Sequence, residues 1–134
     1  MKIKLIIASV LIVCSIHAQT IPVKFTVVER RTKDDILREN IVIARSDSTP
    51  LALERLGRQL NDLSRDYQVS TITVFTTTWA ANQKDIENLS DADNKKWSKA
   101  FVGQFRKRGT TECNFQYDAN GMGGLDRPAT KIDY

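Results

Sequence analysis

The central part of the chain, residues 41–79, reads IVIARSDSTPLALERLGRQLNDLSRDYQVSTITVFTTTW. Its middle has the pattern of an amphipathic helix that begins at Pro50 and ends near Tyr67. Thr49 is a favourable N-cap, and Pro50 suits the first helical position. Apolar residues then recur at steps of three and four, which places five of them on one stripe: Leu53, Leu56, Leu60, Leu63 and Tyr67. We expect this stripe to pack on a sheet of the same domain.

Two predicted strands flank this helix. Ile41–Ala44 is a short, continuous apolar run, which is typical of a strand buried on both faces. Val69–Trp79 combines apolar residues with several threonines, and β-branched residues favour strands. A strand, a helix and a strand in this order indicate a βαβ unit with parallel strands and a right-handed crossover.

Three further elements are predicted outside this unit. Ile21–Arg30 alternates apolar and polar residues and is expected to be the first strand. Residues 91–108 are expected to form a second long helix that ends at Gly109. Cys113–Tyr117 alternates as a last strand with one buried face. The expected fold is α+β: a two-layer domain in which a mixed sheet of about four strands carries two long helices packed on one face.

Residues 1–18 have the three parts of a secretory signal peptide. Lys2 and Lys4 precede an apolar run of about 12 residues that ends at Ile16, and the small residue Ala18 follows shortly after. That run is shorter than the roughly 20 residues of a membrane-spanning helix. We expect cleavage after Ala18 and a periplasmic or secreted mature form exported from a bacterial cytoplasm. An uncleaved membrane anchor and a lipidated Cys14 are the alternatives.

The mature part is predicted to be one globular domain, residues 19–117, followed by a loose C-terminal segment, residues 118–134. The segment has many turn residues and few apolar ones. The whole chain of 134 residues has a net charge of +4, and cleavage removes two basic residues and no acidic one. The remaining positive excess is small, so we do not expect nucleic-acid binding.

Cleavage after Ala18 also removes most of the reactive side chains. His17 is the only histidine, and Cys14 is one of two cysteines. A mature chain with Cys113 alone and no histidine has no Ser-His-Asp or Cys-His mechanism, no Cys/His zinc site and no internal disulfide. The sequence also lacks the GxSxG, Walker A and GxGxxG motifs. We therefore expect no enzyme activity, no metal and no cofactor. Cys113 is expected to be a small buried side chain, with an intermolecular disulfide as the alternative.

Carboxylates are the remaining acid/base groups. Asp34 and Asp35 are adjacent and lie near Glu29 in the sequence. A pair of carboxyl groups can catalyse hydrolysis when both face one bond. The other interpretation is that both acids belong to the first turn of a short helical segment, Lys33–Arg38, capped by Thr32.

The predicted helix 91–108 contains most of the candidate binding residues. Trp97, Phe101 and Phe105 are four residues apart and share one side. Lys95, Lys99 and Arg106 share another side, which faces either solvent, an acidic protein patch or an anionic membrane. Trp79, at the end of a predicted strand, is a candidate hot spot if its ring is more than half exposed.

The first hypothesis is a small exported binding protein that acts through a protein–protein surface. Subunits of envelope machines, enzyme inhibitors and immunity or exclusion proteins fit this description, and the partner is then another envelope or secreted protein. The alternative is a peripheral protein that binds anionic envelope surfaces through the basic helix 91–108. A hydrolase that uses Asp34 and Asp35 is the third hypothesis.

Overall fold

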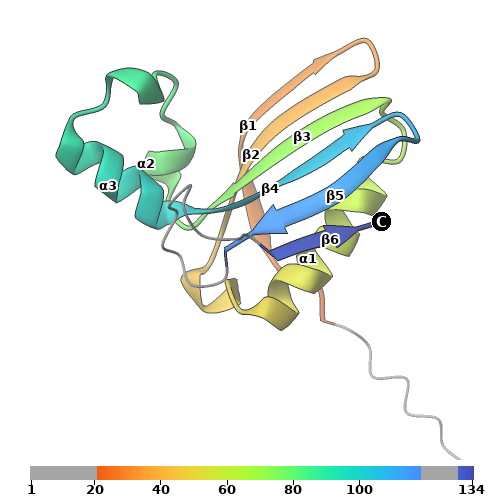
Figure 1. The fold of residues 1–134 in the computed structure, drawn as a ribbon, viewed down its shortest axis with the longest axis horizontal. Coiled ribbons are helices and arrows are strands. Elements are labelled where there is room, and N and C mark those ends of the chain that lie inside the picture. Colours follow the sequence, from red (N-terminus) through yellow and green to blue (C-terminus); the bar gives the residue numbers. More distant parts are fainter. Residues whose placement is uncertain (1–20, 119–129) are drawn as a thin grey trace, which may run out of the picture.

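The computed structural model describes residues 21–118 and 130–134, and these form a six-stranded mixed sheet with helices (Figure 1). The strands lie side by side in chain order, from β1 to β6. Only β2 and β3 are parallel, and every other neighbouring pair is antiparallel. The strands are β1 (Phe25–Lys33), β2 (Ile36–Ile43), β3 (Val69–Phe75), β4 (Phe101–Arg108), β5 (Glu112–Tyr117) and β6 (Thr130–Asp133). The helices are α1 (Pro50–Leu63), α2 (Thr78–Ala81) and α3 (Asp91–Ala100), with 3-10 turns at Arg45–Asp47 and Ile86–Asn88.

The βαβ unit is confirmed. β2 and β3 pair in parallel, and α1 connects them. The side chain of Thr49 accepts a hydrogen bond from the backbone N–H of Ala52 at 3.4 Å, as expected of an N-cap. Helix α1 ends at Leu63, four residues before the predicted end, and beyond it the N–H groups of Arg65 and Tyr67 bond to carbonyls only three residues back, which tightens the chain into a turn.

The main core lies between α1 and one face of the sheet (Figure 1). Leu53, Leu56 and Leu60 of α1 are fully buried there. The sheet contributes alternate residues of its strands, as the pleat requires: Leu37, Ile41, Ile72, Val74, Phe105, Phe115 and Tyr117. The α+β class with a mixed sheet is thus correct, but the sheet has six strands and not about four.

The predicted second helix, residues 91–108, is wrong in its second half. Helix α3 ends at Ala100, and Phe101 begins strand β4 without an intervening loop. Phe101 and Phe105 are spaced as in a helix, but Gly103 between them lies against the backbone of β5. A Cβ at Gly103 would come within 2.4 Å of the Gln116 carbonyl oxygen, so only glycine permits this strand pairing.

Helices α2 and α3 do not share a face of the sheet with α1, in contrast to the prediction. They pack at one end of the sheet in a separate apolar cluster built on Phe75, Ala80, Ala81 and Ala100 (Figure 1). Val42 and Phe101 also contact this cluster. Because Val42 lies between Ile41 and Ile43 in the pleat, it points away from the α1 core.

Two local predictions are also corrected. Strand β3 ends at Phe75 and not at Trp79, because Thr77 caps the short helix α2 by accepting a bond from the Ala80 N–H at 3.3 Å. The segment Lys33–Arg38 is not a helical turn. It is the tip of the β1–β2 hairpin, and Asp34 adopts a positive φ of 52° there.

The C-terminal segment is partly ordered, although residues 118–134 were predicted to be loose. Thr130–Asp133 pairs with β5 as strand β6, and the N–H of Tyr134 donates to the carbonyl of Cys113 at 2.8 Å. The predicted signal peptide, residues 1–18, and the glycine-rich part of the segment lie outside the described residues.

Candidate functional site

The sheet surface opposite α1, here called the polar face, carries two lateral rows of polar side chains. Strand register aligns one residue from each strand in each row, on the side of the pleat that points away from the core. The first row is Arg31, Arg38, Thr71, Arg106, Asn114 and Asp133. The second row is Glu29, Asn40, Thr73, Gln104, Gln116 and Lys131. Neither row contains an aromatic side chain.

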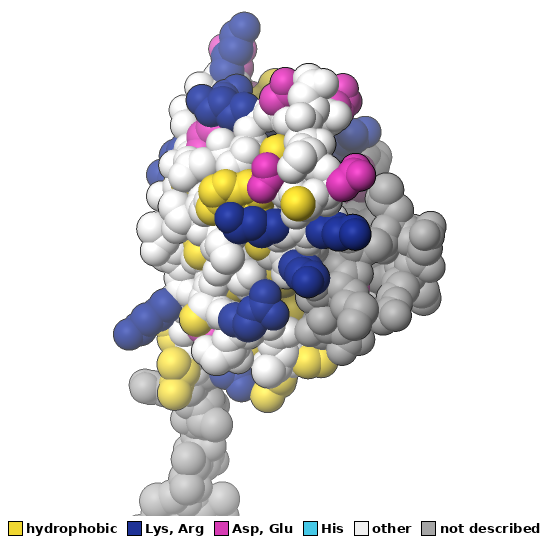
Figure 2. Space-filling view, turned by 90° about the vertical axis from the view of Figure 1, so that its left-hand side faces the viewer, with side chains coloured by type: hydrophobic (Ala, Val, Ile, Leu, Met, Phe, Trp, Pro, Cys, Tyr) yellow, Lys and Arg dark blue, Asp and Glu magenta, His cyan; other side chains and the backbone are white. Residues whose placement is uncertain are grey.

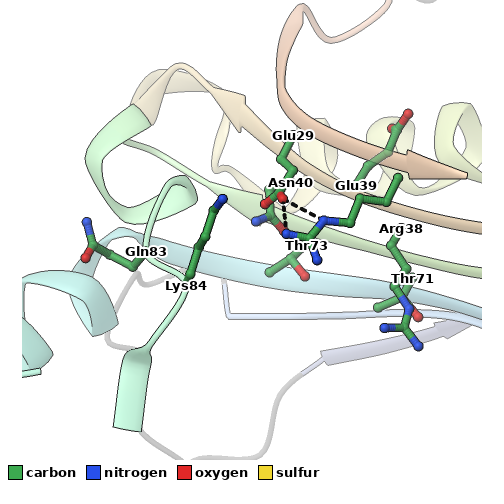
Figure 3. A pocket seen from close by; sticks show the side chains of 9 residues that line it. Glu29, Arg38, Glu39, Asn40, Thr71, Thr73, Gln83 and Lys84 are labelled. Atoms are coloured by element: carbon green, nitrogen blue, oxygen red, sulfur yellow. Dashed lines mark hydrogen bonds and ion pairs between the residues drawn. The ribbon is translucent and has the colours of Figure 1, made fainter. Parts of the chain in front are cut away.

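The first hollow in the polar face has a volume of about 340 Å³ and lies over β1, β2 and β3 (Figure 3). Arg31 and Glu29 form an ion pair within it, with Nε and Oε1 at 2.8 Å. Lys84 reaches toward this pair from the segment after α2, and Figure 3 shows Arg38 beside Thr71 on the opposite side of the hollow. Asn40 donates to the carbonyl of Ala81 at 2.9 Å, which ties α2 to the rim.

The second hollow has a volume of about 370 Å³ and lies over β2, β3 and β4. It shares Arg38 and Thr71 with the first hollow and adds Gln104 and Arg106, so the two hollows adjoin. The Nε of Arg106 donates to Oε1 of Gln104 at 2.6 Å. The amide of Gln104 in turn donates to the Thr73 hydroxyl at 3.1 Å. This chain of bonds fixes the direction of the Arg106 side chain.

The polar face has an excess of positive charge. Arg31 and Arg108 are matched by Glu29 and Glu112, respectively. In the part of the chain that the structure describes, Arg38, Arg106 and Lys84 have no carboxylate partner. Arg38 and Arg106 are exposed to solvent, so their charges are available to an incoming anion.

Comparison with known proteins does not identify the chain. No protein-family model, no curated protein and no solved structure matches it.

The four predicted binding residues do not form one surface. Lys95 and Lys99 are exposed on α3, whereas Arg106 lies on β4 in the polar face. The predicted basic face of a helix 91–108 therefore does not exist as a continuous helical surface. In Figure 2, which views the α2–α3 end, basic side chains gather below the centre, and acidic side chains lie beside and above them.

Trp79 does not meet the exposure expected of a hot spot. It lies on α2, is partly buried, and packs against the cluster of Phe75 and Ala80. The ammonium of Lys96 sits 4.0 Å from the centre of its ring, a cation–π contact that also links α3 to α2. These contacts assign Trp79 to the packing of this end of the molecule.

The two predicted reactive groups lie away from both hollows. Asp34 and Asp35 are exposed at the tip of the β1–β2 hairpin and line neither hollow. Cys113 is half-buried on the α1 side of β5, where its thiol donates to Oδ1 of Asn61 at 3.2 Å. Burial raises the pKa of the Cys113 thiol, and the nearby Lys107 lowers it by a smaller amount.

Within the described ranges, 21–118 and 130–134, no group of three or more metal-ligating side chains is present. None of the helices in these ranges is both long and apolar enough to cross a membrane.

Sequence reasoning missed Arg31, Arg38, Thr71 and Gln104. The available signal was the alternation in Ile36–Ile43, where Arg38 and Asn40 separate residues of the buried face. Only residues 41–44 were predicted as a strand, because the charged start of β2 resembles a loop. The alignment of these residues across strands depends on register, which a single sequence does not specify.

Proposed function

We propose that the protein is a binding protein that docks an acidic segment of a partner protein on its polar face. The observation that carries this proposal is the uncompensated positive charge of Arg38, Arg106 and Lys84 around two adjoining hollows. Clefts lined by charge of one sign attract and orient ligands of the opposite sign. The expected export of the chain makes another envelope or secreted protein the partner that we favour.

The composition of the polar face favours an acidic peptide over a nucleic acid or a sugar. Single-stranded nucleic acids are held largely by stacking on aromatic rings, and the two rows contain none. Threonine, asparagine and glutamine side chains, such as Thr71, Asn40 and Gln104, donate and accept hydrogen bonds of the kind a peptide backbone makes. These residue types suit recognition. Both glutamates that line the first hollow are paired within the protein, Glu29 with Arg31 and Glu39 with Arg30.

The test uses a fluorescent peptide of alternating glutamate and serine, with binding followed by fluorescence anisotropy. The variant R38E/R106E reverses two charges on the polar face. The matched control, R58E/R65E, reverses two exposed arginines on α1 and just after it, on the other side of the sheet. We expect the face variant to weaken binding at least about tenfold and the control to bind as the wild type does.

The partner is then sought by capture from an envelope extract with the same three proteins. We expect one protein to be retained by the wild type and by R58E/R65E, lost with R38E/R106E, and eluted by the acidic peptide. Equal peptide binding by all three proteins would refute the proposal. Binding to anionic vesicles that depends on Lys95 and Lys99, and not on Arg38, would favour a membrane surface in its place.

A further inference from the structure

Arg38, Thr71 and Arg106 occupy matching positions on three neighbouring strands, β2, β3 and β4. Neighbouring strands are about 4.8 Å apart, so the two arginines start about 10 Å from each other with Thr71 midway between them. Both side chains line the second hollow together with Thr71. Two long guanidinium side chains on either side of a hydroxyl group are thus placed around one small space.

The Arg106 side chain is held in position before any ligand arrives. Gln104 accepts from its Nε at 2.6 Å and is itself anchored on Thr73. The two terminal nitrogens of Arg106 have no other hydrogen bond among the described residues, so they remain available as donors. A donor that is already oriented loses less conformational entropy when it binds a ligand.

The charges of Arg38 and Arg106 distinguish this pair from most arginines of the described chain. Arg30, Arg31, Arg58, Arg65 and Arg108 each have a carboxylate partner. Arg38 and Arg106 have none in the described ranges, although they line the same hollow. Two neighbouring cations repel each other, and one doubly charged anion between them would neutralise both.

We infer that Arg38, Thr71 and Arg106 form a binding site for a doubly charged oxyanion of the phosphate class. Guanidinium groups match the oxygens of phosphate by paired N–H donors, and the Thr71 hydroxyl supplies a third donor. The inference rests on the proposed function, because it names the group that anchors an anionic segment on the polar face. A phosphoryl group carried by the partner and free phosphate share this chemistry.

The first experiment compares simple anions at constant ionic strength by calorimetric titration. The probes are inorganic phosphate and sulfate, which carry double charge at pH 8, and acetate and chloride, which carry a single charge. We expect the two divalent anions to bind the wild type with one-to-one stoichiometry and the two monovalent anions to bind at least about tenfold more weakly.

Three variants test the residues of the site. R38Q and R106Q each remove one charge and are expected to weaken phosphate binding about tenfold. Q104E places a carboxylate beside Arg106 and is expected to abolish binding, because it supplies an internal counterion. R58Q, on α1, is the control and should bind phosphate as the wild type does. Thermal unfolding of each variant, without ligand, checks that the fold is retained.

The two proposals fail in different ways. Phosphate that binds the wild type, R38Q and R106Q equally would overturn the site. Acidic peptide that binds through the polar face, with no measurable phosphate binding, would also overturn the site but leave the proposed function standing. A phosphoserine-containing peptide that binds more tightly than both free phosphate and the glutamate peptide would support a phosphoryl group carried by the partner.

Discussion

Glu39 is a charged residue on the buried side of the sheet. Its side chain is 1% exposed and lies on the same face of β2 as the core residues. It forms an ion pair with Nε of Arg30. Its second carboxylate oxygen has no hydrogen-bond partner. A buried carboxylate is costly without a partner, so the Arg30 contact is required for the stability of this side of the sheet.

We therefore expect Arg30→Leu to reduce the free energy of unfolding by about 2 kcal/mol. The loss should be smaller than for a fully buried ion pair. The Arg30 side chain is 55% exposed, so in the variant water can partly take over its contact with Glu39. Urea unfolding of Arg30→Leu, Glu39→Leu and the double variant gives the free energy of unfolding of each. The double variant should be more stable than Arg30→Leu alone, and a simple sum of the two single effects would contradict the argument.

Gly57 on α1 makes room for Tyr134. A Cβ at Gly57 would lie 1.8 Å from the Tyr134 hydroxyl oxygen and 3.1 Å from a ring carbon of Phe115. We expect Gly57→Ala to destabilise the wild type, although alanine is about 1 kcal/mol better than glycine in a helix. In a Tyr134→Ala background the same substitution should be stabilising. Urea unfolding measures the effect of Gly57→Ala in both backgrounds. A loss of stability in both would contradict the proposed contact with Tyr134.

Tyr134 should lose its phenolic proton at a higher pH than an ordinary tyrosine does. Burial raises the pKa of its phenol to about 12, with smaller effects of Arg58, Glu54, Tyr117 and Cys113. A tyrosine in the unfolded chain has a pKa of about 10. The unfolded state therefore loses this proton first, and the free energy of unfolding falls as the pH rises from 10 to 12. Ultraviolet titration and urea unfolding at several pH values measure this, and Tyr134→Phe should reduce the fall.

At the scale of elements, the boundary between α3 and β4 was the least predictable part of the chain. Trp97 and Phe101 do stack, with ring centres 5.5 Å apart. Their four-residue spacing therefore predicted a contact that the structure contains. Phe105, however, belongs to the core on the α1 side of the sheet. The same four-residue spacing thus occurs across a helix–strand junction, and periodicity alone does not distinguish the two cases.

Gly103 provides the test of this boundary. We expect Gly103→Ala to disrupt the β4–β5 pairing, because the new methyl group would collide with backbone atoms of Gln116 and Tyr117. The expected loss in unfolding free energy is about 2 kcal/mol or more. Hydrogen exchange should show faster exchange in Glu112–Tyr117 than in α1. Alanine tolerated at this position without loss of stability would contradict the close approach.

At the scale of the whole molecule, local pattern predicted the elements that form within a short stretch of chain. The stripe on α1 and the apolar half of β2 were strong enough to predict the βαβ unit correctly. The strand β6 and the start of β2 were missed because their residues are mainly polar, and they are held by pairing with neighbours. Arg106 was predicted as a binding residue, but its place beside Arg38 was not, because the two are 68 positions apart and are brought together only through β3.

The identical order of strands in the chain and in the sheet has a mechanical consequence. β1 and β6 are opposite edges of the sheet, and each is held by a single antiparallel neighbour. By the strand register, Asp133 is level with Arg31, so Phe25 and Asp133 lie toward opposite ends of the strands, and force applied between them acts partly along the strands and loads several hydrogen bonds of an edge pair at once. The sheet should therefore resist being pulled by these two ends more than one in which the edge hydrogen bonds open one by one.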